Sequence, residues 1–108
     1  MSESSEERLG LASFEVRREA AVERSLAKIR HHLGKDWTTL SAPEITTLGW
    51  LLGELWATKG FMSWETVGLD KITLATVDHL VDLGNSIRSG ATGTASGLKE
   101  ADSILGRL

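Results

Sequence analysis

Apolar side chains recur at intervals of three and four residues along most of the chain, and this spacing constrains its fold most strongly. One face of an α-helix repeats about every 3.6 residues, so the spacing predicts helices that bury one side. Three long segments show it, at 5–33, 42–59 and 70–88, and a shorter one follows at 97–107. We therefore expect an all-α fold, a small antiparallel helical bundle of three long helices and a short C-terminal helix.

The first and second helices carry recognisable ends. Gly34 follows the first at the position of a left-handed C-cap, whereas Gly10 weakens its start, so earlier residues are expected to fray. Ser41 and Glu44 form the pattern of a capping box at the start of the second, and Gly60 ends it. The apolar sets expected to be buried are Phe14, Ala21, Val22, Leu26, Ile29 and Leu33 in the first helix, and Ile45, Leu48, Leu52, Leu55 and Trp56 in the second.

The remainder of the chain is less sharply patterned. Residues 61–69 fit either a helical turn or an irregular loop. A helix is expected to begin near Asp70, but the β-branched residues within 72–77 make a strand the alternative there. Residues 89–97 are all small, three of them glycine, and predict a flexible linker. The last helix carries Leu98, Ala101, Leu105 and Leu108 and is too short to be stable alone, so it must dock on this core or on a partner.

Length and composition limit the class of protein. The 108 residues suit one domain spanning 1–108, and the absence of cysteine excludes disulfides, thiolate zinc sites and a cysteine nucleophile. The Ser/Glu-rich N-terminus lacks the basic start and apolar run of a secretory signal. The most apolar window, residues 48–57, is about half of what a bilayer requires. We expect a soluble cytoplasmic protein that has no membrane partner.

Charge is unevenly distributed along the chain. Residues 1–16 have a net charge of −3, residues 17–35 of +4 and residues 36–108 of −4. Within the basic segment, five side chains fall on one helical face. This basic face consists of Arg17, Arg24, Lys28, His31 and Lys35. It can be a solvated surface, or it can meet an acidic protein partner or the phosphates of nucleic acid.

Catalytic and metal-binding patterns are weak. His31 and His32 are adjacent and diverge on a helix, and Asp78, His79 and Asp82 make a ligand trio only if another helix contributes. No nucleophile elbow or phosphate-binding glycine motif is present. We therefore predict no enzymatic activity, no cofactor and no metal.

Small residues and tryptophans point instead to an interaction surface. Gly49, Gly53, Ala57 and Gly60 form a ridge on the second helix, and helical glycine costs about 0.5–1 kcal/mol relative to alanine. The ridge therefore predicts the close approach of a second helix, from this chain or another. All four tryptophans lie within residues 37–64, where they serve as core filler, as anchors of a protein interface or as a ligand pocket. Trp50 stands off the main leucine stripe, so if that stripe faces the core we expect Trp50 at its edge or on the surface.

These observations favour a non-enzymatic protein–protein interaction module, such as a small regulator, inhibitor or adaptor. It would bind a protein partner, or a second copy of itself, through a Trp/Gly-rich surface. The predicted partner-binding residues are Trp50, Gly53, Trp56, Phe61 and Trp64. The alternative is nucleic-acid or nucleotide binding through the basic face of the first helix.

Overall fold

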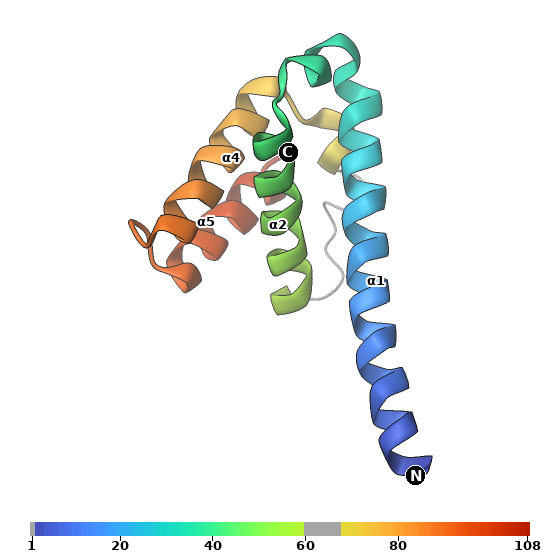
Figure 1. Ribbon diagram of the computed structural model, residues 1–108. Coiled ribbons are helices and arrows are strands. Elements are labelled where there is room, and N and C mark those ends of the chain that lie inside the picture. The colour runs from blue at the N-terminus through green and yellow to red at the C-terminus, as the bar shows by residue number, and fades with distance from the viewer. Residues whose placement is uncertain (1, 60–67) are drawn as a thin grey trace.

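The computed structural model describes the backbone of residues 2–59 and 68–108, and the side chains of residues 13–59 and 68–108. Its helices are α1 (Ser2–Leu33), α2 (Ala42–Lys59), α4 (Leu74–Ser89) and α5 (Thr94–Gly106). Two short 3₁₀ helices, η1 (Gly34–Thr39) and η2 (Gly68–Lys71), precede α2 and α4. No strand occurs in these residues, so the predicted all-α helical bundle is confirmed (Figure 1). The predicted turn or loop at 61–69 lies mostly outside the described residues.

Helix α2 occupies the centre of the bundle. It packs against α1 on one side and α4 on the other, and α5 closes against both α4 and α2. Its buried residues therefore exceed the single stripe that the sequence predicted: Thr47, Leu48, Leu51, Leu52, Gly53 and Leu55. Ile45 and Trp56, expected in the core, are only half-buried. Each fully buried leucine contributes about 1.5–3 kcal/mol of hydrophobic stabilisation, so the buried leucines of α2 form a large part of the core.

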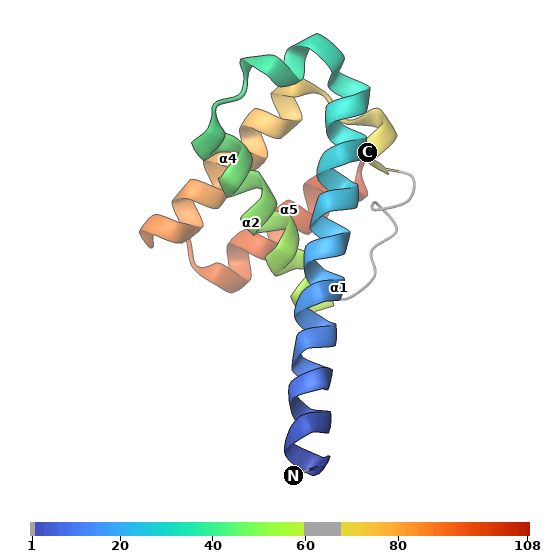
Figure 2. The same ribbon diagram turned by 45° about the vertical axis from the view of Figure 1, so that its right-hand side comes forward.

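Helix α1 is longer than the bundle on which it packs. At about 1.5 Å per residue its 32 residues span roughly 48 Å, close to the 50 Å long axis of the molecule. Figures 1 and 2 show its N-terminal part projecting beyond the other helices. Ala21, Ser25 and Ile29 are buried, but Phe14 is 40% exposed, so the prediction that Phe14 lies in the core is wrong. The apolar spacing continues past the point where the bundle ends.

The predicted capping box at the start of α2 is confirmed. The backbone N–H of Ser41 donates to Oε1 of Glu44 at 2.9 Å, and the N–H of Glu44 donates to Oγ of Ser41 at 3.3 Å. The backbone hydrogen bond from Ser41, and then its side-chain hydrogen bond, lower the pKa of the Glu44 carboxyl below its ordinary value. Local chemistry therefore fixes where α2 begins.

Helix α4 begins later than the sequence indicated. Thr73 caps it, because its Oγ1 accepts the N–H of Thr76 at 3.2 Å, and η2 occupies the residues from Gly68 to Lys71 that precede it. The competing strand over residues 72–77 is absent, since residues 74–77 already belong to the helix. At its other end Gly90 adopts a left-handed φ of 84°, and Gly34 after α1 does the same at 56°, as predicted for that position.

The stretch predicted as a linker is largely helical. Helix α5 begins at Thr94, three residues before the expected start, which leaves residues 90–93 as the connection. Gly97 is buried there, and a methyl group at this position would overlap the side chain of Ile87. Leu98, Ala101 and Leu105 are buried as predicted, together with Ile104, which the sequence analysis overlooked. The last helix therefore docks on the core of its own chain.

Candidate functional site

The glycines of α2 face α1 of the same chain. A methyl group at Gly49 would lie 3.5 Å from side-chain carbons of Val22 and Leu26, and one at Gly53 would lie 3.4 Å from Cγ2 of Val22. These are ordinary van der Waals distances. The second helix that the ridge predicted is thus α1, although the two backbones are not pressed together. Gly60, the last member of the ridge, lies outside the described residues.

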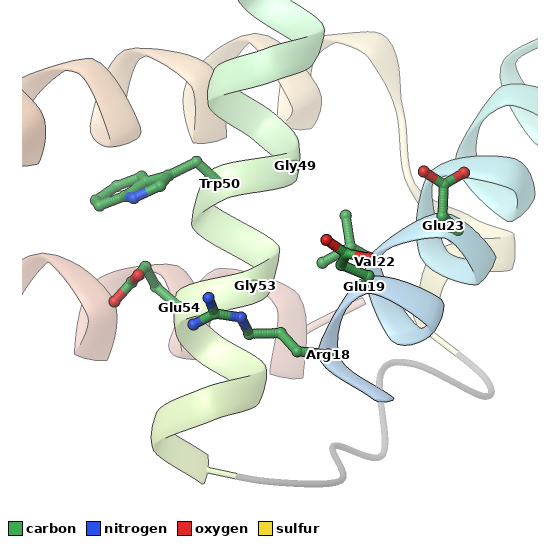
Figure 3. A pocket seen from close by; sticks show the side chains of 8 residues that line it. All are labelled: Arg18, Glu19, Val22, Glu23, Gly49, Trp50, Gly53 and Glu54. Atoms are coloured by element: carbon green, nitrogen blue, oxygen red, sulfur yellow. The ribbon is translucent and has the colours of Figure 1, made fainter. Parts of the chain in front are cut away.

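Beside this contact, the surface between α1 and α2 is hollowed into a groove of about 410 Å³. We call it the glycine groove, and its lining residues are Arg18, Glu19, Val22, Glu23, Gly49, Trp50, Gly53 and Glu54. In Figure 3, Gly49 and Gly53 lie on α2, and Arg18 of α1 reaches toward that helix. Trp50 and Glu54 are directed away from α1. The space exists because the helix surface carries no side chain at the two glycines.

The charged residues of the glycine groove are mostly acidic. Glu19, Glu23 and Glu54 line it together with a single base, Arg18. The guanidinium of Arg18 already donates to the carboxylate of Glu15 at 2.8 Å. The lining therefore has a net charge of −2, and one ion pair already engages its only base. Such a surface attracts a cationic group more readily than an anionic one.

Trp50 is held from the side of α4. The guanidinium of Arg88 lies 5.4 Å from the centroid of the Trp50 ring, within the range of a cation–π interaction. The same guanidinium donates to Oγ1 of Thr47 at 3.4 Å, and that hydroxyl donates to Oδ1 of Asn85 at 3.2 Å. Because Arg88 and Asn85 lie about 40 residues away in sequence, helical periodicity within α2 carried no signal for either of them.

A second, smaller hollow continues along the same pair of helices. It has a volume of about 200 Å³ and shares Glu23 with the glycine groove. Its other lining residues are Leu26, Ala27, Arg30, Trp37 and Ile45. Trp37 and Ile45 are half-buried and pack against the core. The two hollows together offer indole and aliphatic surface along the α1–α2 contact.

The predicted partner-binding residues do not all meet in one place. Trp50 and Gly53 line the glycine groove, whereas Trp56 points to another part of α1. Its ring centroid is 5.5 Å from that of Phe14, and the Arg17 guanidinium lies 5.8 Å from it. Phe61 and Trp64 lie outside the described residues. Two residues of the groove, Trp50 and Gly53, were therefore predicted from the sequence, whereas its lining residues on α1 were not. Spacing within one helix does not indicate which other helix packs beside it.

The basic face follows α1 and continues into η1, which holds Lys35. Arg17, Arg24, His31 and Lys35 are exposed, and Lys28 is half-buried. Arg17 stands beside the Phe14–Trp56 pair, so this end of the face combines a cation with two aromatic rings. It lies apart from the glycine groove, whose lining includes none of these five residues.

Metal-ligand candidates are exposed on α4. Asp78, His79 and Asp82 all face solvent. Among the side chains that the structure describes, in residues 13–59 and 68–108, no three His, Asp or Glu residues gather as a metal site would require. Over the described backbone, residues 2–59 and 68–108, no helix is both long and apolar enough to cross a membrane.

Comparison of the chain with known protein families, with curated proteins and with solved structures finds no match.

Proposed function

We propose that this chain is a non-enzymatic protein-interaction module, a small regulator, inhibitor or adaptor, and that the glycine groove is its binding surface. One observation carries the proposal: a hollow of about 410 Å³ is lined by two glycines and a half-buried tryptophan. Tryptophan is enriched among the residues that dominate protein interfaces, because it offers a large apolar area and one donor.

The occupant that this surface fits is a peptide segment of another protein that carries an apolar anchor and a basic residue. The hollow beside Gly49 and Gly53 has room for a side chain, and the indole of Trp50 supplies apolar contact. Glu19 of α1 and Glu54 of α2 supply negative charge. A basic residue beside the anchor would complement these carboxylates and favour its association.

Selection from a displayed peptide library tests this proposal. The full chain serves as bait, and Trp50→Ala, which removes the indole from the groove, serves as the counter-selection. We expect peptides enriched on the unmodified chain to carry a large apolar residue next to Lys or Arg. Equal enrichment on both baits would overturn the proposal.

Variants of the selected complex then locate the contact. Trp50→Ala should weaken binding about 30-fold or more, as loss of an interface anchor does, with helicity by circular dichroism retained. Trp56→Ala is the matched control, because it removes the same residue type from the same helix outside the groove. Glu54→Lys should change the preference of the surface from basic to acidic peptides without changing the floor. Equal losses for Trp50→Ala and Trp56→Ala would contradict the assignment.

Nucleic-acid binding is the second candidate function, favoured by the position of Arg17 beside Trp56 and Phe14. A cation next to exposed aromatic surface suits a phosphate and a stacked base. Such binding would fall steeply with salt, whereas groove binding would depend on salt only mildly. Electrophoretic mobility shifts with single-stranded oligonucleotides at low and moderate salt separate the two functions.

A further inference from the structure

The outer face of α1 is not covered by the bundle. Val16 is 61% exposed and Phe14 is 40% exposed. Within residues 13–59 and 68–108, these two are the large apolar side chains that are exposed. Phe14 contacts Trp56, whereas Val16 lies about half a turn around the helix from the buried Ser25. Ala20 and Ala27 share that outer face and are exposed, and Ala27 also lines the edge of the second hollow. Small side chains at these positions let another helix approach closely.

The charge distribution along α1 favours a second copy of α1 as the approaching helix. Residues 1–16 have a net charge of −3 and residues 17–35 of +4, so α1 is acidic along one half and basic along the other. A second copy of α1 running in the opposite direction would place each acidic half against a basic half. A copy running in the same direction would place like charges together, which disfavours association.

The shape of the molecule allows the same arrangement. The bundle packs on the C-terminal half of α1, and the N-terminal part projects beyond it (Figures 1 and 2). In an antiparallel pair, the projecting part of each copy would lie along the outer face of its partner, where Ala20 and Ala27 are exposed. The two bundles would then stand at opposite ends of the helix pair. The glycine groove does not suit the projecting part, since a lining of −2 repels a segment of −3.

We infer that two copies of this chain associate through antiparallel α1 helices, with the acidic N-terminal segment of each along the basic half of the other. This surface is separate from the floor of the glycine groove, so it goes beyond the proposed function. Val16 lies near the middle of α1 and would be covered in the pair.

Exchange of charges tests the inference directly. A first variant, Glu3→Lys with Glu6→Lys and Glu7→Lys, changes residues 1–16 from −3 to +3 because three acids become bases. A second, Arg24→Glu with Arg30→Glu and Lys35→Glu, changes residues 17–35 from +4 to −2 in the same way. Sedimentation equilibrium of the full chain should give twice its 11.7 kDa mass at high concentration. Each variant alone should associate at least about tenfold more weakly.

The mass of an equimolar mixture of the two variants tests whether opposite charges hold the pair together. Opposite charges again face one another in the mixed pair, so the mixture should recover the dimer mass that each variant alone has lost. An unmodified chain that stays at 11.7 kDa at every concentration would overturn the inference. A mixture that stays monomeric would overturn it too. The groove variant Trp50→Ala removes a side chain that contacts α4 and leaves α1 in place, so it should dimerise normally. Failure of this inference and failure of the proposed function are therefore distinguishable.

Spin labels determine the direction of the pair. The chain has no cysteine, so Ser5→Cys or Ala27→Cys provides a single labelling site. The two positions are about 33 Å apart along one helix, from 22 residues at 1.5 Å each. Antiparallel pairing predicts a long distance between two labels at position 5 and a short one between labels at 5 and 27 of different copies. A short distance between the two labels at position 5 would show a parallel pair and contradict the inference.

Discussion

Thr47 on α2 lies directly over Gly84 on α4, where a methyl group would come within 2.7 Å of Cγ2 of Thr47. Thr47 is buried, and its hydroxyl is bonded to both Asn85 and Arg88, so it cannot rotate away freely. We expect Gly84→Ala to lower the free energy of unfolding by about 1–3 kcal/mol, the usual cost of overpacking. Urea unfolding followed by circular dichroism measures this change.

Two further variants control that experiment. Gly49→Ala also replaces a helical glycine that faces another helix, but its nearest neighbours are 3.5 Å away. It should stabilise the fold by about 0.5–1 kcal/mol, the ordinary preference for alanine in a helix. Thr47→Ser keeps the hydroxyl and removes Cγ2, so it should restore much of the stability lost in Gly84→Ala. Equal effects at positions 49 and 84 would contradict the packing described here.

Docking of α5 depends on Gly97. A methyl group there overlaps the side chain of Ile87, whereas one at Gly106, at the end of the same helix, meets no atom within 4 Å. Gly97→Ala should therefore speed amide hydrogen exchange throughout α5, because the helix must shift away from α4. Gly106→Ala should not. Unchanged protection in Gly97→Ala would show that Ile87 rearranges without cost.

The capping box makes stability depend on pH. The hydrogen bonds from Ser41 lower the pKa of Glu44 in the folded state, so the unfolded chain binds more protons between that pKa and the ordinary one. The contribution is complete above the unfolded pKa and is lost as pH falls through the folded one. Ser41→Ala keeps the backbone hydrogen bond, which is the larger cause, and removes the side-chain one. It should therefore raise the pKa of Glu44 part of the way toward its ordinary value, as measured by carboxyl NMR titration. It should also cost about 1 kcal/mol at neutral pH. An unchanged titration midpoint would contradict this account.

Arg88 and Trp50 should be energetically coupled. The guanidinium lies 5.4 Å from the ring centroid, and exposed cation–π pairs contribute about 0.5–1 kcal/mol. A double-mutant cycle with Arg88→Met and Trp50→Leu should return a coupling free energy of that size from urea unfolding. The pair Arg88 and Trp37 provides a comparison for which no such interaction is described. Coupling of zero between Arg88 and Trp50 would mean that the indole is held by α2 alone.

Features set by neighbouring residues could be predicted from the sequence, whereas features set by distant ones could not. The box at Ser41 and Glu44 and the left-handed Gly34 depend on a few adjacent positions, and both were predicted correctly. The close approach lies at Gly84 instead of at Gly49, because sequence alone does not say which helix each glycine faces. Gly97 is surrounded by small residues that resemble a linker, and only its contact with Ile87 explains why it is buried.

The candidate site was predicted to a similar extent. Trp50 and Gly53 were identified because tryptophan and helical glycine are conspicuous in a short chain. Trp56 was expected beside them, but Phe14 and Arg17 of α1 cover it instead. Phe14 itself follows the apolar spacing and yet is exposed, since periodicity marks a face of a helix and not the length over which that face is covered.

Because α1 is longer than the bundle, its projecting part forms as an extension of the part that packs on the other helices. Starting a helix is costly and lengthening one is cheap, because the first turn fixes several residues for a single hydrogen bond. The packed half of α1 supplies that first turn, so the rest grows from it one residue at a time. Temperature and salt can therefore shift the point at which the helix ends while the core stays folded. Any molecule that binds the projecting part needs only to extend an existing helix.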